Sequence, residues 1–179
     1  ADGAQNVNGT QHDVPAQRAC QECHVNLPEP PLAFSAIQLS HSLPGETLQS
    51  LSKAGWLTHP ATRDYAPPGD EATRAGLGYL HANCGHCHNP SGSARPDTDM
   101  NLQLTYGLTT LAQSNTYRTT LEVALQYFDD APLRLRVAPG SPEQSGLLLR
   151  MQQRGRRVQM PPLASEQVDA HGVELIRRW

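Results

Sequence analysis

The chain has 179 residues and a formal net charge of −3 at pH 7, with only 14 lysine and arginine residues in total. This balance excludes the basic surface that nucleic acids bind and a polybasic anchor for a membrane surface. Apolar runs such as residues 147–149 are far shorter than the roughly 20 residues that span a bilayer. We therefore expect neither a nucleic-acid partner nor a membrane span.

Large apolar side chains are scarce in this sequence. Hydrophobic residues make up 37% of the chain and aromatic residues 5%, which is low for a domain of this size. Glycine and proline add 14 and 15 residues, so much of the chain is expected to form loops. A chain of this kind builds only a limited core by itself, which favours a bound hydrophobic group that completes the core.

The N-terminal part combines polar and proline-rich stretches with two short helix candidates. Residues 1–15 are polar and predict a loose arm. Residues 28–31 contain three prolines, which cannot continue a helix. Residues 34–42 and 46–56 are the two helix candidates. A proline-rich connection follows over residues 58–69.

We place a domain boundary in that connection. It divides the chain into a small N-terminal segment, residues 1–66, and a C-terminal domain, residues 67–179. Asp70 can cap the first helix of the C-terminal domain. The apolar or small positions of this helix follow the spacing of one helical face; they are Ala72, Ala75, Gly76, Tyr79, Leu80, Asn83 and Cys87.

Three more helices are expected toward the C-terminus. A second amphipathic pattern consists of Tyr117, Leu121, Ala124, Leu125 and Phe128. Ser141 begins a capping box with Pro142 at the first helical position, which predicts a helix through Arg154. The last helix is expected to start at Ser165. Since no strand-like alternation of useful length appears, the expected fold class is all-α with long loops.

All four cysteines lie in two CxxCH motifs, at residues 20–24 and 84–88. Two cysteines three positions apart lie on one side of a helical turn, which suits attachment to the two vinyl groups of one haem, and the next histidine can bind the iron. The motifs therefore predict two covalently bound haem c groups. The thioether residues would be Cys20, Cys23, Cys84 and Cys87, and the histidine ligands would be His24 and His88.

Other chemistries use paired cysteines. A thioredoxin-like redox pair is disfavoured because no βαβ pattern surrounds either motif. Two CxxC units are also the usual ingredients of a zinc site, although zinc does not explain a histidine after both pairs. Structural disulfides are the third alternative, in an exported protein.

Met160 is the expected sixth ligand of the second haem. It lies in a proline-containing segment, residues 158–163, that stays out of a helix and can cross a haem face. A thioether favours ferrous iron and raises the reduction potential. Met151 is expected to be a core residue, and Met100 is the weaker rival ligand.

The first haem has no methionine downstream before residue 100, so its sixth ligand is expected to be a histidine or to be absent. We favour His59, which follows the helix candidate at residues 46–56, and place His41 second. His81 and His86 are expected to be solvent-facing or hydrogen-bonded rather than ligands. The histidines considered for this position are His12, His41, His59, His81 and His171.

Residues 70–179 resemble a class I-type cytochrome c domain. Gly76 and Leu80 before Cys84 are similar to the small and large residues at which the first and last helices of that family cross. The resemblance implies that Trp179 is the aromatic partner on the last helix, and that Met160 is the distal ligand.

The chain from about residue 20 onward also resembles a family of bacterial exported haem proteins that join a short CxxCH segment to a second haem domain. The similar blocks are residues 34–40, 78–90, 138–143 and 160–163. This resemblance implies two haems but names no substrate.

The sequence starts at Ala1 and does not open with a methionine, a basic segment or an apolar segment. This is expected of a mature N-terminus after removal of a signal peptide. A periplasmic or otherwise exported location is therefore expected, because bacterial haem attachment takes place there. The leading functional hypothesis is single-electron transfer between exported redox proteins, by a monomer or a transient complex. The alternatives are a dihaem oxidoreductase, such as a peroxidase or small-molecule dehydrogenase with one open or labile haem site, and a haem domain docked on a larger enzyme.

Overall fold

The computed structural model describes residues 2–25, 27, 31–32, 34–126, 133–155 and 157–179. Within these residues lie six short α-helices, three 3-10 turns and four isolated β-bridges, with no longer strand. The α-helices are α1 (Gln17–His24), α2 (Leu48–Lys53), α3 (Glu71–Asn83), α4 (Asn115–Thr120), α5 (Gly146–Gln152) and α6 (Ala170–Arg178). None of these helices is long and apolar enough to cross a membrane.

The expected all-α, cytochrome c-like fold class is wrong. The six α-helices take up 49 of the described residues, and most of the other described residues are irregular. The longest helix, α3, has 13 residues, and the other five have between six and nine. The protein has a small helix-containing fold in which turns, loops and isolated bridges position much of the chain.

Helix α3 forms where the sequence predicts it, because its start signal and its apolar face are local features. The Asp70 side chain accepts a hydrogen bond from the Thr73 N–H at 2.9 Å, which satisfies one of the free donors of the first turn. Gly76, Leu77 and Leu80 are the buried residues of this helix. Both leucines have no measurable exposure, so α3 is the central element of the core.

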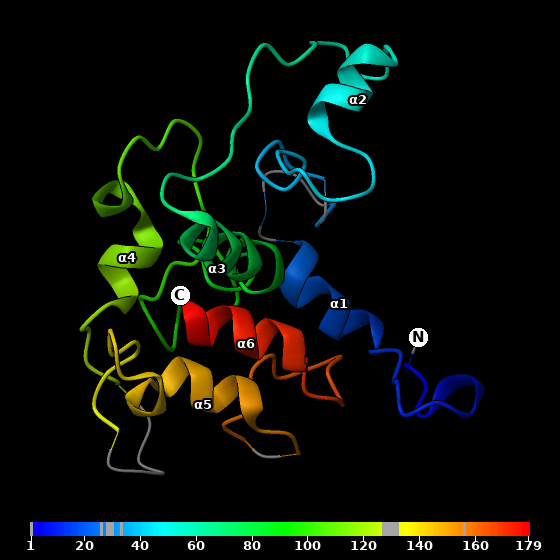
Figure 1. Cartoon of the computed structure of the whole chain (residues 1–179). Helices are drawn as coiled ribbons and strands as arrows, with labels where there is room; N and C mark the ends of the chain where they lie inside the picture. Colours follow the sequence, from blue (N-terminus) through cyan, green and yellow to red (C-terminus); the bar gives the residue numbers. More distant parts are fainter. Residues whose placement is uncertain (1, 26, 28–30, 33, 127–132, 156) are drawn as a thin grey trace.

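Helices α3, α6 and α5 lie one below the other in Figure 1, with α6 in contact with both of its neighbours. Leu80 of α3 and Leu102 join the apolar side chains of α5 and α6 in the main core cluster. Met151, on α5, is 7% exposed and belongs to this cluster, which confirms that it is a core residue. The cluster members are Leu80, Leu102, Leu147, Leu148, Met151, Val173 and Ile176.

A second, smaller cluster connects the N-terminal segment to the C-terminal part. Ile37 packs with Leu77 of α3 and Leu104. The Ser35 hydroxyl also lies 3.3 Å from Nε2 of His81. Apolar and polar contacts thus cross the boundary expected near residue 66.

The two helix candidates of the N-terminal part differ in outcome. Within residues 34–42 the chain forms a turn at residues 36–39 and no helix, so the expected helix there is wrong. The Gln38 N–H donates to the Ser35 hydroxyl at 3.2 Å. Helix α2 is shorter than the candidate at residues 46–56 but buries Leu48 and Leu51 on one face. It starts at a capping box between Thr47 and Ser50. The proline-rich residues 28–30 lie outside the described residues.

The amphipathic helix expected over residues 117–128 is replaced by bridges. Helix α4 ends at Thr120, and Leu121 is already extended. The Glu122 N–H donates to the Val137 carbonyl at 3.0 Å, and the Val137 N–H donates to the Thr120 carbonyl at 3.1 Å. Pairing with a distant segment therefore takes the hydrogen bonds that a helix would use. Phe128, the last residue of the expected pattern, lies outside the described residues.

The capping box expected at Ser141 does not form. Its side chain makes no capping hydrogen bond, and only a 3-10 turn, Pro142–Gln144, follows it. Ser145 interrupts the helix, because its backbone bridges Leu135 and its hydroxyl accepts from the Ala138 N–H at 2.9 Å. Helix α5 starts only after this interruption.

The last helix starts five residues later than expected. The Ser165 hydroxyl donates to the Pro161 carbonyl at 2.8 Å, which holds Ser165 in the loop instead of at a helix start. Asp169 takes the capping role and accepts from the Gly172 N–H at 2.9 Å. Helix α6 thus begins at a different cap but keeps Val173 and Ile176 on its buried face.

Candidate functional site

The second CxxCH motif forms a tight turn at the C-terminal end of α3. The Cys84 N–H donates to the Leu80 carbonyl at 2.9 Å, so Cys84 closes the helix. The N–H groups of Cys87 and His88 both donate to the Cys84 carbonyl, at 3.1 and 2.8 Å. Because one helical turn separates the two cysteines, this backbone suits attachment of both sulfurs to one group.

His88 is buried and its imidazole is kept neutral. The residue is 8% exposed, and its Nδ1 finds no hydrogen-bond partner among the described residues. Burial is the main cause that lowers the pKa of His88 to about 4, and the positive charges of Arg150 and Arg136 lower it further. A neutral imidazole is the form that binds a metal ion. The same two cations also make the surroundings of His88 favourable for an anionic group.

Asn89 holds the loop that follows the motif. It is 4% exposed, and its amide nitrogen donates to the carbonyls of Gly85 and His86, at 2.9 Å each. Its side-chain oxygen accepts from the Ser91 N–H at 2.9 Å. Asn89 therefore fixes the backbone on both sides of His88. Sequence reasoning did not single out this residue; the only signal was its position between the motif and Pro90.

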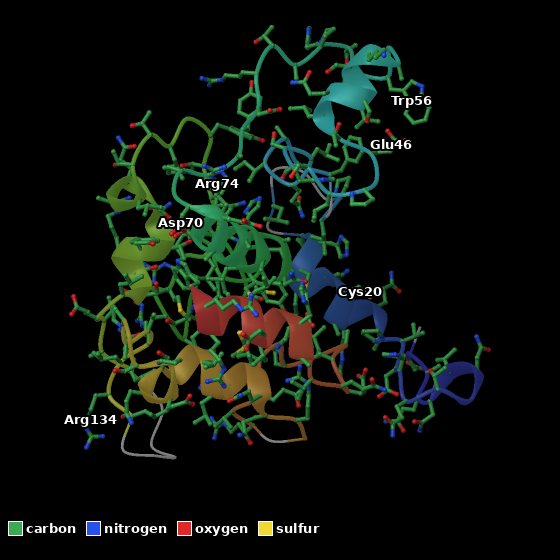
Figure 2. The ribbon with its side chains drawn as sticks, viewed as in Figure 1. Cys20, Glu46, Trp56, Asp70, Arg74 and Arg134 are labelled. Carbon is green, nitrogen blue, oxygen red and sulfur yellow. The ribbon has the colours of Figure 1, made fainter. Side chains whose placement is uncertain are left out.

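The first CxxCH motif lies in α1 and is far more open. Cys20 and His24 are exposed, Cys23 is partly buried, and no residue described in α1 is fully buried. Figure 2 shows Cys20 on α1, beside the N-terminal arm. The helix places Cys20, Cys23 and His24 along one turn, as attachment requires, but protein atoms cover little of it. A hydrophobic group bound at this motif would supply the missing cover.

The structure brings together the second cysteine of each motif. The sulfur atoms of Cys23 and Cys87 are 3.5 Å apart, although the residues are separated by 64 positions. The Cys87 sulfur also lies 4.0 Å from the Glu22 carbonyl oxygen. Figure 1 shows α1 beside the C-terminal end of α3, where the second motif begins. No sequence signal indicated this contact, because the spacing of the motifs carries no information on their distance in space.

His86 completes a cluster of three possible metal ligands with this pair of cysteines. One ligand atom from each of Cys23, His86 and Cys87 lies within 4.8 Å of the others. The first cysteines of the motifs are elsewhere: the Cys20 sulfur is 4.0 Å from the Pro15 carbonyl, and Cys84 packs against the main core cluster. The structure therefore disfavours a single zinc site made of all four cysteines.

The two sulfur atoms of this cluster differ in acidity. Burial, followed by the hydrogen bond with Cys87, raises the pKa of Cys23 to about 12. Burial also opposes ionisation of Cys87, but hydrogen bonds with His86, Ser93 and Cys23 outweigh it and lower the pKa of that thiol. Cys87 is thus the thiol that ionises first. Burial raises the pKa of Cys84 to about 12.

Met160 lies in an irregular segment after α5, as expected. Its N–H donates to the Arg150 carbonyl at 3.0 Å, so this segment is fixed to α5. Met160 and Met100 are both partly buried, and Met100 packs against the core cluster that Cys84 also contacts. These positions leave Met160 as the predicted ligand and Met100 as its rival.

The histidines considered for the first haem occupy different environments. His59 is exposed in the irregular segment after α2, and His41 is partly buried and accepts from the Leu43 N–H at 3.2 Å. His81 accepts from the Leu104 N–H at 3.2 Å, which confirms that it is hydrogen-bonded. Burial lowers the pKa of His81 to about 4. No contact described in the structure joins His59 or His41 to the first motif.

Comparisons with known proteins gave no match to a family model, to a curated protein or to a solved structure. The chemistry of the site therefore comes from its own residues. Two thiols one helical turn apart, followed by a neutral buried imidazole, form a donor set that fits a covalently attached haem at the second motif. The first motif offers the same residue types on a more exposed helix.

Proposed function

We propose that this chain carries two covalently attached haems and transfers single electrons between exported redox proteins. The observation that supports this proposal best is the second motif, where a single turn presents Cys84, Cys87 and the neutral, buried His88. A haem supplies one-electron chemistry through its iron, and the protein tunes that chemistry through axial ligands and burial.

The residues of the chain have distinct roles in this proposal. Cys20 and Cys23 hold one haem, and Cys84 and Cys87 hold the other. His24 and His88 are the histidine ligands, and Met160 is the second ligand at the buried site. His59 is the proposed second ligand at the exposed site, with His41 as its alternative. Asn89 orients His88 through its hydrogen bonds to the flanking backbone.

The proposed alternative function is a dihaem oxidoreductase with one open haem. The observation in its favour is the exposure of His24 at the first motif, which leaves that side of α1 accessible to small molecules. A catalyst needs a displaceable or absent ligand, whereas an electron carrier needs two firmly held ligands.

The cluster of Cys23, His86 and Cys87 favours a different chemistry, in which the chain binds a soft transition metal ion instead of haem. Two sulfurs and one imidazole nitrogen are the donor set of zinc sites that keep one position open. This alternative leaves Cys20, Cys84, His24 and His88 without a role. We therefore place it behind the haem proposal.

One set of measurements separates these three functions. The full chain is produced in a bacterium that attaches haem to exported proteins, and its haem and metal contents per chain are quantified. Two haems, with a reduced spectrum that carbon monoxide leaves unchanged, support electron transfer. Two haems with carbon monoxide bound at one of them favour the oxidoreductase.

Matched double variants assign each haem to its motif. C20S/C23S and C84S/C87S are each expected to retain one haem per chain. Zinc in stoichiometric amount with no haem, in protein produced with active attachment machinery, would overturn the haem proposal and support the Cys23, His86 and Cys87 site.

A further inference from the structure

Resting on the proposed function, we infer that the two haems form a coupled pair, attached to the protein at adjoining sulfur atoms. The pair would be joined where Cys23 of α1 meets Cys87 of the second motif. An electron that enters at either haem would then pass directly to the other. The chain would act as one redox unit with two irons and not as two independent carriers.

The contact between the two cysteines is the basis of this inference. Their sulfurs are 3.5 Å apart, which is van der Waals contact for sulfur atoms. Both are the second cysteine of their motif, so the two attachments are equivalent. The remaining attachment residues, Cys20 and Cys84, lie in different surroundings: Cys20 is exposed, while Cys84 packs against the main core cluster. The two haems therefore meet at one edge and extend into different environments.

This contact limits the distance between the irons. Each sulfur is connected to its iron through a few bonds of about 1.5 Å each. Sulfurs 3.5 Å apart would then keep two attached irons within roughly 15 Å of each other. A separation of this size places the edges of the two rings close together.

The two motifs lie in different environments, and this difference would set the direction of electron transfer between the haems. His88 is 8% exposed, and its motif adjoins the main core, whereas His24 and α1 are open to solvent. Burial at the second motif would disfavour the additional positive charge of a ferric iron more strongly than the open first motif does. The second iron is therefore the harder one to oxidise, and electrons move toward it.

The exchange step is balanced without any other reactant. An iron held at the first motif would be oxidised from ferrous to ferric while an iron held at the second motif would be reduced from ferric to ferrous. No covalent bond forms or breaks, and no proton is transferred. After one iron has been oxidised, its charge opposes oxidation of the other.

The test uses the complete, haem-loaded chain and its Soret circular dichroism. A coupled pair gives a two-signed band in the fully reduced wild-type protein, whereas isolated haems give bands of one sign each. The paramagnetic resonance spectrum of the fully oxidised protein provides a second measurement. We expect it to differ from the sum of the C20S/C23S and C84S/C87S spectra, because the two ferric irons interact.

The outcomes distinguish this inference from the function on which it rests. Two haems per chain with additive spectra and no two-signed band would overturn the coupled pair and leave the electron carrier intact. Fewer than two haems per chain would overturn both. If a double variant fails to fold, the circular dichroism of the wild-type protein decides the question by itself, since it requires no variant.

Discussion

Gly76 of α3 and Trp179, which follows α6, approach so closely that no side chain fits between them. A β-carbon placed on Gly76 would lie 2.7 Å from both Cβ and Cγ of Trp179. The Trp179 ring also meets the Tyr117 ring of α4 edge to face, with ring centres 5.7 Å apart. Trp179 therefore connects three helices, and Gly76 is the residue that allows it to do so. The small residue and the aromatic partner expected from the sequence are in contact, although the fold class expected with them is wrong.

We expect Gly76→Ala to destabilise the protein by about 1–3 kcal/mol, because overpacking forces α3 and α6 apart. The free energy of unfolding in urea, followed by circular dichroism, measures the effect. Gly78→Ala is the matched control. A β-carbon at Gly78, on the same helix, meets nothing within 4 Å. That substitution is expected to leave stability unchanged or to raise it by about 0.5–1 kcal/mol through helix propensity. Equal effects of the two substitutions would contradict the close contact.

Asp169 is expected to make the free energy of unfolding depend on pH in the acidic range. A hydrogen bond from the Gly172 N–H is the main cause that lowers the pKa of Asp169, and the Tyr79 hydroxyl, which donates at 2.9 Å, lowers it further. A carboxyl with a lowered pKa stabilises the folded state fully above its unfolded pKa, about 4. That contribution is lost as the pH falls through the folded pKa.

Two substitutions test this dependence by urea unfolding between pH 7 and pH 3. In Asp169→Asn, stability should change less with pH, because the titrating group is absent while asparagine still caps the helix. Tyr79→Phe should cost about 1 kcal/mol at pH 7, and the pKa of Asp169 should rise. An unchanged pH profile in Asp169→Asn would show that the carboxyl does not contribute.

Removing Arg136 should cost more folding stability than removing its ion-pair partner Asp99. The Arg136 side chain is 4% exposed and the Asp99 side chain 56%. The Arg136 guanidinium also donates to the Thr119 carbonyl at 2.7 Å. Arg136→Ala should therefore cost about 2–4 kcal/mol, because it removes buried contacts as well as the charge. Asp99→Asn should cost less than about 1 kcal/mol, because its carboxylate is largely in solvent. Urea unfolding at pH 7 checks both values, and losses of equal size would contradict the asymmetry.

Met160→Leu should change the electronic properties of the proposed haem at the second motif without unfolding the protein. If Met160 is the ligand, the ferric protein should lose the near-infrared band typical of a methionine–iron bond, and its reduction potential should fall. Met151→Leu is the control, because Met151 is buried in the main core cluster and leucine has a similar volume. Loss of the band in Met100→Leu, with no change in Met160→Leu, would assign the ligand to Met100 instead.

The elements that the sequence predicted correctly depend on interactions between near neighbours. Asp70 caps α3 through a residue three positions away, and the apolar spacing of α3 lies within 13 residues. Leu48 and Leu51 share the buried face of α2 for the same reason. The expected helices at residues 34–42 and 117–128 were wrong, since distant segments or side chains took the backbone hydrogen bonds.

Helix starts near Ser141 and Ser165 could not be predicted from a capping pattern alone. Both serines have the residue type of a cap, but Ser165 is bound to the Pro161 carbonyl and the turn after Ser141 ends at Ser145. Each local preference was about 1 kcal/mol, a size that a competing tertiary contact easily overcomes.

The sequence by itself determined the chemistry available to this protein: two CxxCH motifs, the histidines and methionines proposed as ligands, and the helix that leads into the second motif. Only the tertiary structure decided that His88 is buried, that Asn89 holds its loop, and that Cys23 meets Cys87. The reason is physical. Residue types and short spacings fix which bonds can form, whereas burial and contacts between distant residues depend on how the helices and loops pack together.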